Sequence, residues 1–177
     1  MLSESISACD DFSALVGRRV DAYFHADGYW RFFVALRVED GQRIVFSTEE
    51  RGLSTYFEVF PLKFEFEASE ERQWVSFEPL LIKTVRPLWR LEWLEPIDDK
   101  GQFLGSGPHH VHHAGAGPVS SAAVLVARVL AGVTLSDRAG RTLLLSASDS
   151  APFNVDIAVQ PAAVATMLDG FESPQLD

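Results

Sequence analysis

The chain has 177 residues, of which 47% are hydrophobic and 23% charged, and its formal net charge at pH 7 is −10. This length predicts one domain whose core is large enough to fold without disulfides, which a single cysteine cannot form within the chain. Because so acidic a protein repels phosphate backbones, we exclude nucleic acid as a partner. No apolar run approaches the ~20 residues that span a bilayer, and no signal peptide is recognisable, so we expect a soluble, cytoplasmic protein without a membrane role.

Alternation of apolar and polar residues predicts a three-stranded antiparallel meander over 19–25, 30–39 and 42–48. The pair Asp40-Gly41, between the last two strands, is typical of a type I′ turn, in which both central residues need positive φ. The residues expected to face the core are Val20, Ala22, Phe24, Trp30, Phe32, Val34, Leu36, Val38, Ile44 and Phe46.

Two prolines bear on the strands that follow. Pro61 indicates an edge strand or a bulge at the start of the alternating stretch 62–67, because proline has no N–H to donate to a central ladder. Pro87 is expected to interrupt the next strands, which resume over 88–95.

The stretch 88–95 combines tryptophan, arginine and glutamate. Its alternation predicts that Trp89 and Trp93 point into the core while Arg90 and Glu92 form an exposed ion pair. Tryptophan, tyrosine and arginine are also the residue types that most often anchor protein interfaces. The candidate partner-binding residues are Tyr56, Phe57, Arg90 and Glu92.

The stretch 96–118 is rich in glycine and histidine and is expected to be a loop or linker. It is the one candidate for an internal division of a single domain, 1–177. Imidazoles at this density can bind Zn²⁺, and the candidate ligands are His109, His110, His112 and His113. The flanking glycines predict a flexible segment and no second ligand motif completes a tetrahedron, so we expect no physiological metal site and no cofactor.

The C-terminal part of the chain is expected to add strands and a short helix. The stretch 119–135 fits either a helix or a strand, and its β-branched residues with Gly132 favour a bent strand. The helix is expected to begin at Pro161 and to end before Gly170.

These patterns predict a mainly β fold, an antiparallel barrel or sandwich of about nine strands with a short helix near each terminus. The sequence contains no nucleophile elbow, phosphate loop or zinc-protease motif, so we favour a protein without catalytic activity. The first hypothesis is a binding or inhibitory protein whose partner has a basic face. In general character the chain resembles small acidic immunity or accessory proteins that are paired with toxins or effectors. The alternative is a ligand-binding or hydrolytic β-barrel with an aromatic-lined pocket and acidic residues.

Overall fold

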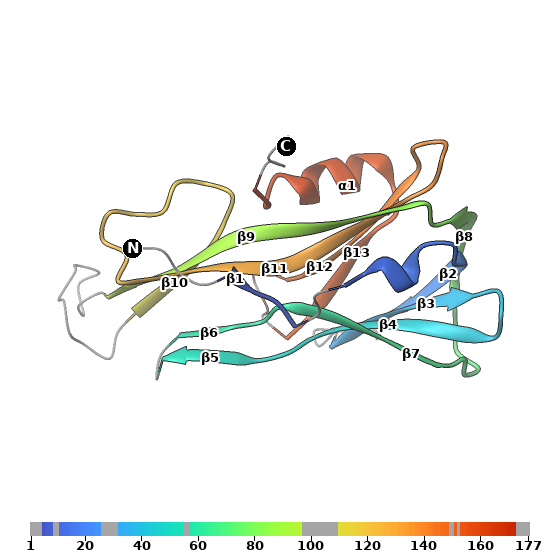
Figure 1. The fold of residues 1–177 in the computed structure, drawn as a ribbon, viewed down its shortest axis with the longest axis horizontal. Helices are drawn as coiled ribbons and strands as arrows, with labels where there is room; N and C mark the ends of the chain where they lie inside the picture. The colour runs from blue at the N-terminus through green and yellow to red at the C-terminus, as the bar shows by residue number, and fades with distance from the viewer. Residues whose placement is uncertain are drawn as a thin grey trace.

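The computed structural model describes residues 5–8, 11–25, 32–54, 57–96, 110–148, 151 and 153–172. Most of them lie in β-strands, which confirms the mainly β fold (Figure 1). The strands are β1 (Ser5–Ile6), β2 (Arg19–His25), β3 (Phe33–Val38), β4 (Gln42–Thr48), β5 (Arg51–Ser54), β6 (Phe57–Val59), β7 (Leu62–Ala68), β8 (Val75–Leu81), β9 (Thr84–Pro96), β10 (His110–Gly115), β11 (Leu125–Ser136), β12 (Thr142–Ala147) and β13 (Val155–Ala158). A 3₁₀ turn, Ser13–Leu15, and helix α1, Pro161–Leu168, lie near the two ends. Within the described residues no helix is long and apolar enough to cross a membrane.

Two sheets make up the body of the molecule. The five-stranded sheet has the order β7-β4-β3-β2-β8, and the six-stranded sheet has the order β10-β9-β11-β12-β13 with β1 parallel to β11. Strands β5 and β6 form a separate two-stranded ribbon. Helix α1 covers the face of the six-stranded sheet that is turned away from the five-stranded sheet (Figure 1). The terminal position of β7 confirms the edge strand that Pro61 indicated.

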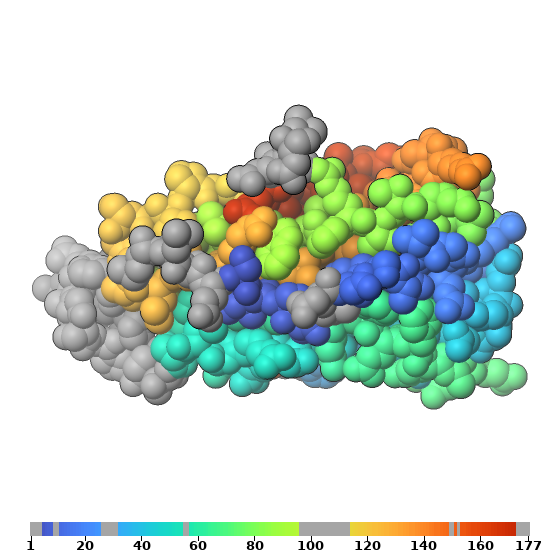
Figure 2. Space-filling view, viewed as in Figure 1, coloured from blue at the N-terminus to red at the C-terminus, as the bar shows by residue number. Residues whose placement is uncertain are grey.

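The main hydrophobic core lies between the two sheets. Leu36 and Phe46 from one sheet and Leu135 and Leu145 from the other are all 0% exposed in a single cluster. Burial of each such side chain stabilises the fold by roughly 1.5–3 kcal/mol. The N-terminal segment, blue in Figure 2, lies along the seam between the sheets, where Phe12 and Leu15 join this cluster.

Most residues expected to face the core are buried. The ones that lie in the main core are Val20, Val34, Leu36, Val38, Ile44 and Phe46. Ala22 is also buried, but it lies opposite Arg37 and so on the outer face of the sheet. Phe32 is instead 53% exposed, so its predicted place in the core is wrong, and Trp30 lies outside the described residues.

Strand β2 departs from the predicted alternation. Its register against β3 shifts after Val20, and beyond the shift Tyr23 lies opposite Leu36 while Phe24 lies opposite Ala35. Opposite residues of an antiparallel pair share a face, so Tyr23 turns toward the core and Phe24 toward the outside. The prediction that Phe24 shares the inner face with Val20 is therefore wrong. The bulge shifts the alternation by one residue, so that the side chains after it point to the opposite faces of the sheet.

The turn between β3 and β4 also differs from the prediction. Gly41 has a φ of +78°, but no described residue other than glycine has positive φ, so the turn is not type I′. The Gly41 N–H donates to the Val38 carbonyl at 3.3 Å, and the Asp40 carboxylate accepts the Gln42 N–H at 3.1 Å. This is the three-residue hairpin loop in which a type I turn is followed by a left-handed glycine.

Strand β9 runs through Pro87 without the expected interruption. Pro87 pairs with Val133 of β11, whereas the pairing of β9 with β10 covers only Leu91–Pro96. At Pro87 the strand therefore has a ladder on one side only, where a residue without an N–H is tolerated.

The stretch 96–118 is not entirely a loop. Its residues His110–Gly115 form β10, antiparallel to β9, while 97–109 lie outside the described residues. The strands on either side of the stretch, β9 and β11, pair along their length in one sheet.

Strand β11 confirms that 119–135 favours a bent strand over a helix. Its register against β9 shifts between Leu130 and Gly132. A Cβ atom on Gly132 would lie 2.7 Å from the ring of Phe171 and 3.1 Å from the Leu145 carbonyl oxygen. Phe171 is 5% exposed, so only glycine lets this buried ring lie directly on the strand.

Substitution Gly132→Ala should therefore lower the free energy of unfolding by about 1–3 kcal/mol, the usual cost of overpacking, as measured by urea denaturation. Substitution Gly52→Ala is the matched control, because a Cβ atom on this strand glycine meets nothing within 4 Å. In a Phe171→Ala background Gly132→Ala should cost less. An equal cost in both backgrounds would contradict the role given to the ring.

Candidate functional site

The outer face of the five-stranded sheet gathers aromatic and arginine side chains from segments far apart in the chain. We call Phe24, Phe33, Arg37, Arg72 and Trp74 the aromatic–arginine patch. The Phe24 ring centroid lies 5.9 Å from that of Phe33 and 6.4 Å from that of Trp74. The Arg72 guanidinium stands 4.7 Å over the Phe24 ring and the Arg37 guanidinium 5.8 Å over the Trp74 ring. These are cation–π distances, so the contacts hold the patch in order.

Ion pairs with neighbouring carboxylates hold the two arginines of the patch in place. Arg37 donates two hydrogen bonds to Asp21, at 2.8 Å and 3.1 Å, and the Asp21 hydrogen bond raises the pKa of Arg37. Arg72 donates to Glu70 at 2.7 Å. Bidentate geometry of the Arg37 kind limits side-chain freedom, so the patch is largely ordered before any partner arrives.

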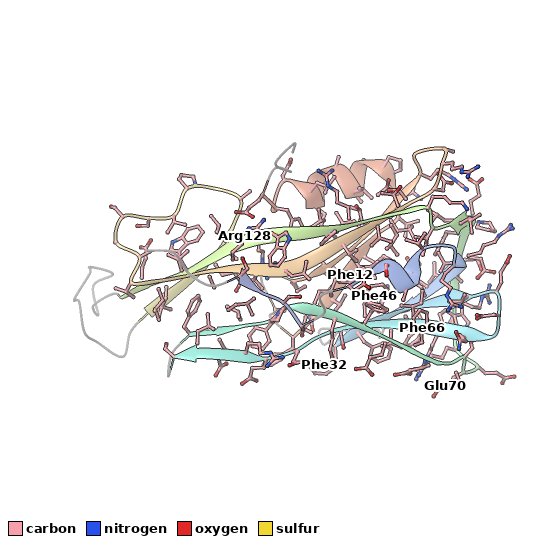
Figure 3. The ribbon with its side chains drawn as sticks, in the orientation of Figure 1. Phe12, Phe32, Phe46, Phe66, Glu70 and Arg128 are labelled. Carbon is pink, nitrogen blue, oxygen red and sulfur yellow. The ribbon has the colours of Figure 1, made fainter. Side chains whose placement is uncertain are left out.

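Carboxylates border the patch along β7 and the loop that follows. We call Glu65, Glu67, Glu70 and Glu71 the acidic margin, and Figure 3 shows Glu70 on the side of the molecule far from α1. The Glu65 and Glu70 side chains are 60% and 56% exposed. The hydrogen bond from Arg72, together with the charge of Arg43, lowers the pKa of Glu70 below its ordinary value, so its carboxylate stays ionised.

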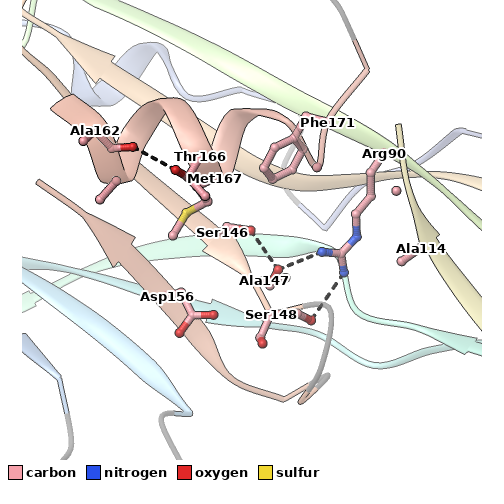
Figure 4. A pocket seen from close by; sticks show the side chains of 13 residues that line it. Arg90, Ala114, Ser146, Ala147, Ser148, Asp156, Ala162, Thr166, Met167 and Phe171 are labelled. Atoms are coloured by element: carbon pink, nitrogen blue, oxygen red, sulfur yellow. Dashed lines mark hydrogen bonds between the residues drawn. The ribbon is translucent and has the colours of Figure 1, made fainter. Parts of the chain in front are cut away.

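A cavity of about 600 Å³ lies beneath α1 on the opposite side of the molecule (Figure 4). We call it the α1 cavity. Arg90, Ser146 and Asp156 belong to its floor on the six-stranded sheet, and Thr166 and Phe171 belong to its roof.

Arg90 is fixed within this floor by three hydrogen bonds. It donates from Nε to Glu92 at 2.9 Å. As Figure 4 shows, it also donates from Nη1 to the Ala147 carbonyl at 2.8 Å and from Nη2 to the Ser148 carbonyl at 3.5 Å. The side chains of Arg90 and Glu92 are only 7% and 1% exposed. A charge buried this deeply depends on its partner, because removal of one member leaves the other uncompensated in a low dielectric.

A second cavity of about 810 Å³ opens between β8, β13 and α1, and we call it the edge cavity. Tyr23, Phe77 and Ile157 give it an aromatic and aliphatic lining. At its rim, Arg141 lies 2.6 Å from Glu78 and 2.7 Å from Asp137.

The structure places the candidate partner-binding residues inside the molecule where it describes them. Phe57 is 1% exposed in the second hydrophobic cluster, and Tyr56 lies outside the described residues. Arg90 and Glu92 form the predicted ion pair, but the prediction that the pair is exposed is wrong. A partner contact by these four residues stays a prediction.

The reason for the error is that both faces of β9 are covered. Trp89 packs against the main core as expected, while α1 and Phe171 cover the face that carries Arg90. Alternation separates the two faces of a strand, but it marks solvent only where one face is open.

The histidine-rich stretch lies partly in the sheet. The backbone of His110, His112 and His113 belongs to β10, and His109 lies outside the described residues. In the part of the chain that the structure describes, no group of three or more histidine, cysteine or acidic residues is placed to hold a metal ion.

Sequence reasoning missed the aromatic–arginine patch, although each of its members is visible in the sequence. Its assembly depends on the bulge in β2, which turns Phe24 outward beside Trp74. The described residues form a mainly β sandwich that carries the aromatic–arginine patch, the α1 cavity and the edge cavity. Comparison of the chain with family models, curated proteins and solved structures gives no match.

Substitution Arg90→Met should lower the free energy of unfolding by about 3–5 kcal/mol, because it removes the cation that pairs with the buried Glu92 carboxylate at 2.9 Å. The double variant Arg90→Met/Glu92→Leu should recover much of this loss in the same urea denaturation. The control is Lys63→Met, which breaks an exposed pair with Glu65 and should cost no more than about 1 kcal/mol. Equal losses for Arg90→Met and Lys63→Met would contradict the burial of the pair.

Proposed function

We propose that this chain is a non-catalytic protein that forms a stoichiometric complex with a protein carrying a basic surface. The partner docks on the aromatic–arginine patch and its acidic margin. The most concrete version is an immunity or inhibitory protein that acts in the cytoplasm. The observation that carries the proposal is the joining of ordered aromatic and arginine side chains to exposed carboxylates on one sheet face.

The residue types of the patch suit the centre of an interface. Tryptophan and arginine dominate the residues whose truncation costs binding energy. Because Arg37 and Arg72 are already held by Asp21 and Glu70, little side-chain entropy is lost when a partner covers them.

The acidic margin is the reason why we expect the partner's surface to be positively charged. It has four carboxylates and three neighbouring cations, Lys63, Arg43 and Arg72. Each cation is paired with a carboxylate. The surplus is negative, in keeping with the net charge of −10. Charges of this kind speed the encounter with a basic partner and are screened when the Debye length falls to ~8 Å at physiological salt.

The test begins with capture of a stoichiometric partner from the source cells, with the wild-type chain as bait. Substitution Trp74→Ala should then speed dissociation of the purified complex by about tenfold or more, as expected for an interface anchor. The pair Glu65→Lys/Glu71→Lys should slow association at low salt. The pair Glu50→Lys/Glu58→Lys, outside the margin, is the control with the same change of charge.

Two results would contradict the proposal. If both charge-reversed pairs slow association equally, the partner does not dock on the acidic margin. If no stoichiometric protein is recovered while the purified chain retains a small molecule, the binding proposal falls and ligand binding takes its place.

The edge cavity favours ligand binding as the second candidate function. Its aromatic lining from Tyr23 and Phe77, together with the nearby Glu78 carboxylate, supports this candidate. Its volume of about 810 Å³ lies within the usual range for small-molecule sites. Native mass spectrometry of the purified chain should then show a retained apolar molecule, which Leu143→Trp should displace.

A further inference from the structure

We propose that the edge cavity binds an organic amine, a ligand with an apolar body and a positively charged ammonium group. This inference deepens the second candidate function, ligand binding in the edge cavity, and rests on it. It names the chemical class of the ligand and does not depend on the protein partner proposed for the aromatic–arginine patch.

The edge cavity lies where the ends of the two sheets meet. Strand β8 is last in the five-stranded sheet and β13 is last in the six-stranded sheet, and residues of both strands line the cavity. Along the seam at β7 the chain fills the space between the sheets itself, since Phe12 stacks on Phe64 with ring centroids 5.3 Å apart. Between β8 and β13 the described residues leave a space of about 810 Å³ instead, so a ligand from outside would complete the packing there.

Apolar side chains make up most of the lining, and some of them stay in contact with solvent. Val75 and Leu168 both line the cavity, and they are 47% and 38% exposed. Removing such surface from water favours a ligand that is itself apolar. The body of the ligand is therefore expected to be aliphatic or aromatic.

Tyr23 and Phe77 give this lining a surface that attracts a cation. Their rings are half-buried, with centroids 6.3 Å apart and planes inclined by 26°. The face of an aromatic ring carries partial negative charge and attracts an ammonium group within about 6 Å. Among the described residues no guanidinium stands over either ring, so a cationic ligand would meet no competing arginine there.

The charges at the rim of the cavity determine the sign of the ligand. Of the lining side chains, Glu78 and Arg141 are the ones that carry a full charge. Arg141 is already bound to Asp137, to which it donates from Nε at 2.7 Å, and the Asp137 side chain is only 8% exposed. Glu78 lies 2.6 Å from the same guanidinium, and its side chain is 80% exposed. Two carboxylates therefore share one guanidinium, so an ammonium group is attracted where a ligand carboxylate would be repelled.

The test uses three probes that share a phenyl ring and have nearly equal size: phenethylamine, which is cationic, phenethyl alcohol, which is neutral, and phenylacetate, which is anionic. Each is titrated into the ¹⁵N-labelled full chain, and the backbone amide signals of Phe77 and Leu143 are followed. The amine should shift both signals saturably. It should bind at least about fivefold more tightly than the alcohol, because an exposed ion pair and a cation–π contact each add a modest attraction. Phenylacetate should bind most weakly.

Added salt and two variants show whether this preference arises at the rim. Salt at physiological strength should reduce the preference for the amine, because the rim is open to solvent. Substitution Glu78→Gln removes the surplus carboxylate from an exposed position, where the fold should tolerate it. It should reduce the preference to about twofold, the part left to the cation–π contact, and leave the affinity of the alcohol unchanged. The control Glu65→Gln, which removes the same charge from β7, should change neither.

The inference is overturned if the amine and the alcohol bind equally, or if Glu78→Gln leaves the preference unchanged. Either result would leave ligand binding in the edge cavity standing, because the alcohol still binds there. If no probe binds saturably, the inference is overturned as well. The retained molecule sought by native mass spectrometry then decides the second candidate function independently.

Discussion

The close approach of Phe171 to Gly132 is the contact on which the architecture depends. It lies where β11 changes register, so that Val129 belongs to the second hydrophobic cluster while Val133 belongs to the main core. The buried ring brings the chain end to the edge of β9, where the Glu172 N–H donates to the Trp89 carbonyl at 2.8 Å. The position of α1, and with it the roof of the α1 cavity, follows from this contact.

Local pattern was enough to predict the strands whose partners are their neighbours in sequence. Strands β3 and β4 form such a hairpin, and Leu36 and Ile44 face each other across it at 0% exposure. The residues of β2 after Val20 were predicted to face the wrong side of the sheet. The bulge there involves β8 as well, because the register of β2 against β8 shifts at the same place. A pairing partner some fifty residues away leaves no mark on local alternation.

The candidate sites were less predictable than the strands for the same reason. Arg90 hydrogen-bonds to Ala147, 57 positions later in the chain, and Phe24 meets Trp74 across the β2–β8 pair. Arginine and glutamate side by side on a strand indicate solvent unless something covers them. Here the cover comes from α1 and Phe171, much later in the chain, so alternation wrongly predicted that the pair is exposed to solvent.

The aromatic–arginine patch and the α1 cavity lie on opposite outer faces of the sandwich, and this separation has a physical consequence. A protein on the aromatic–arginine patch and a ligand in the α1 cavity share no described residue, so neither excludes the other sterically. Coupling between them would have to pass through the core that joins the sheets, where Phe46, Leu135 and Leu145 are fully buried. Close-packed interiors transmit a change only when an element has two discrete arrangements. Helix α1 packs mainly on β12 and β13 of the six-stranded sheet, and no second arrangement of a described element links it to the patch. Independent occupation of the two sites is therefore the behaviour that this architecture favours.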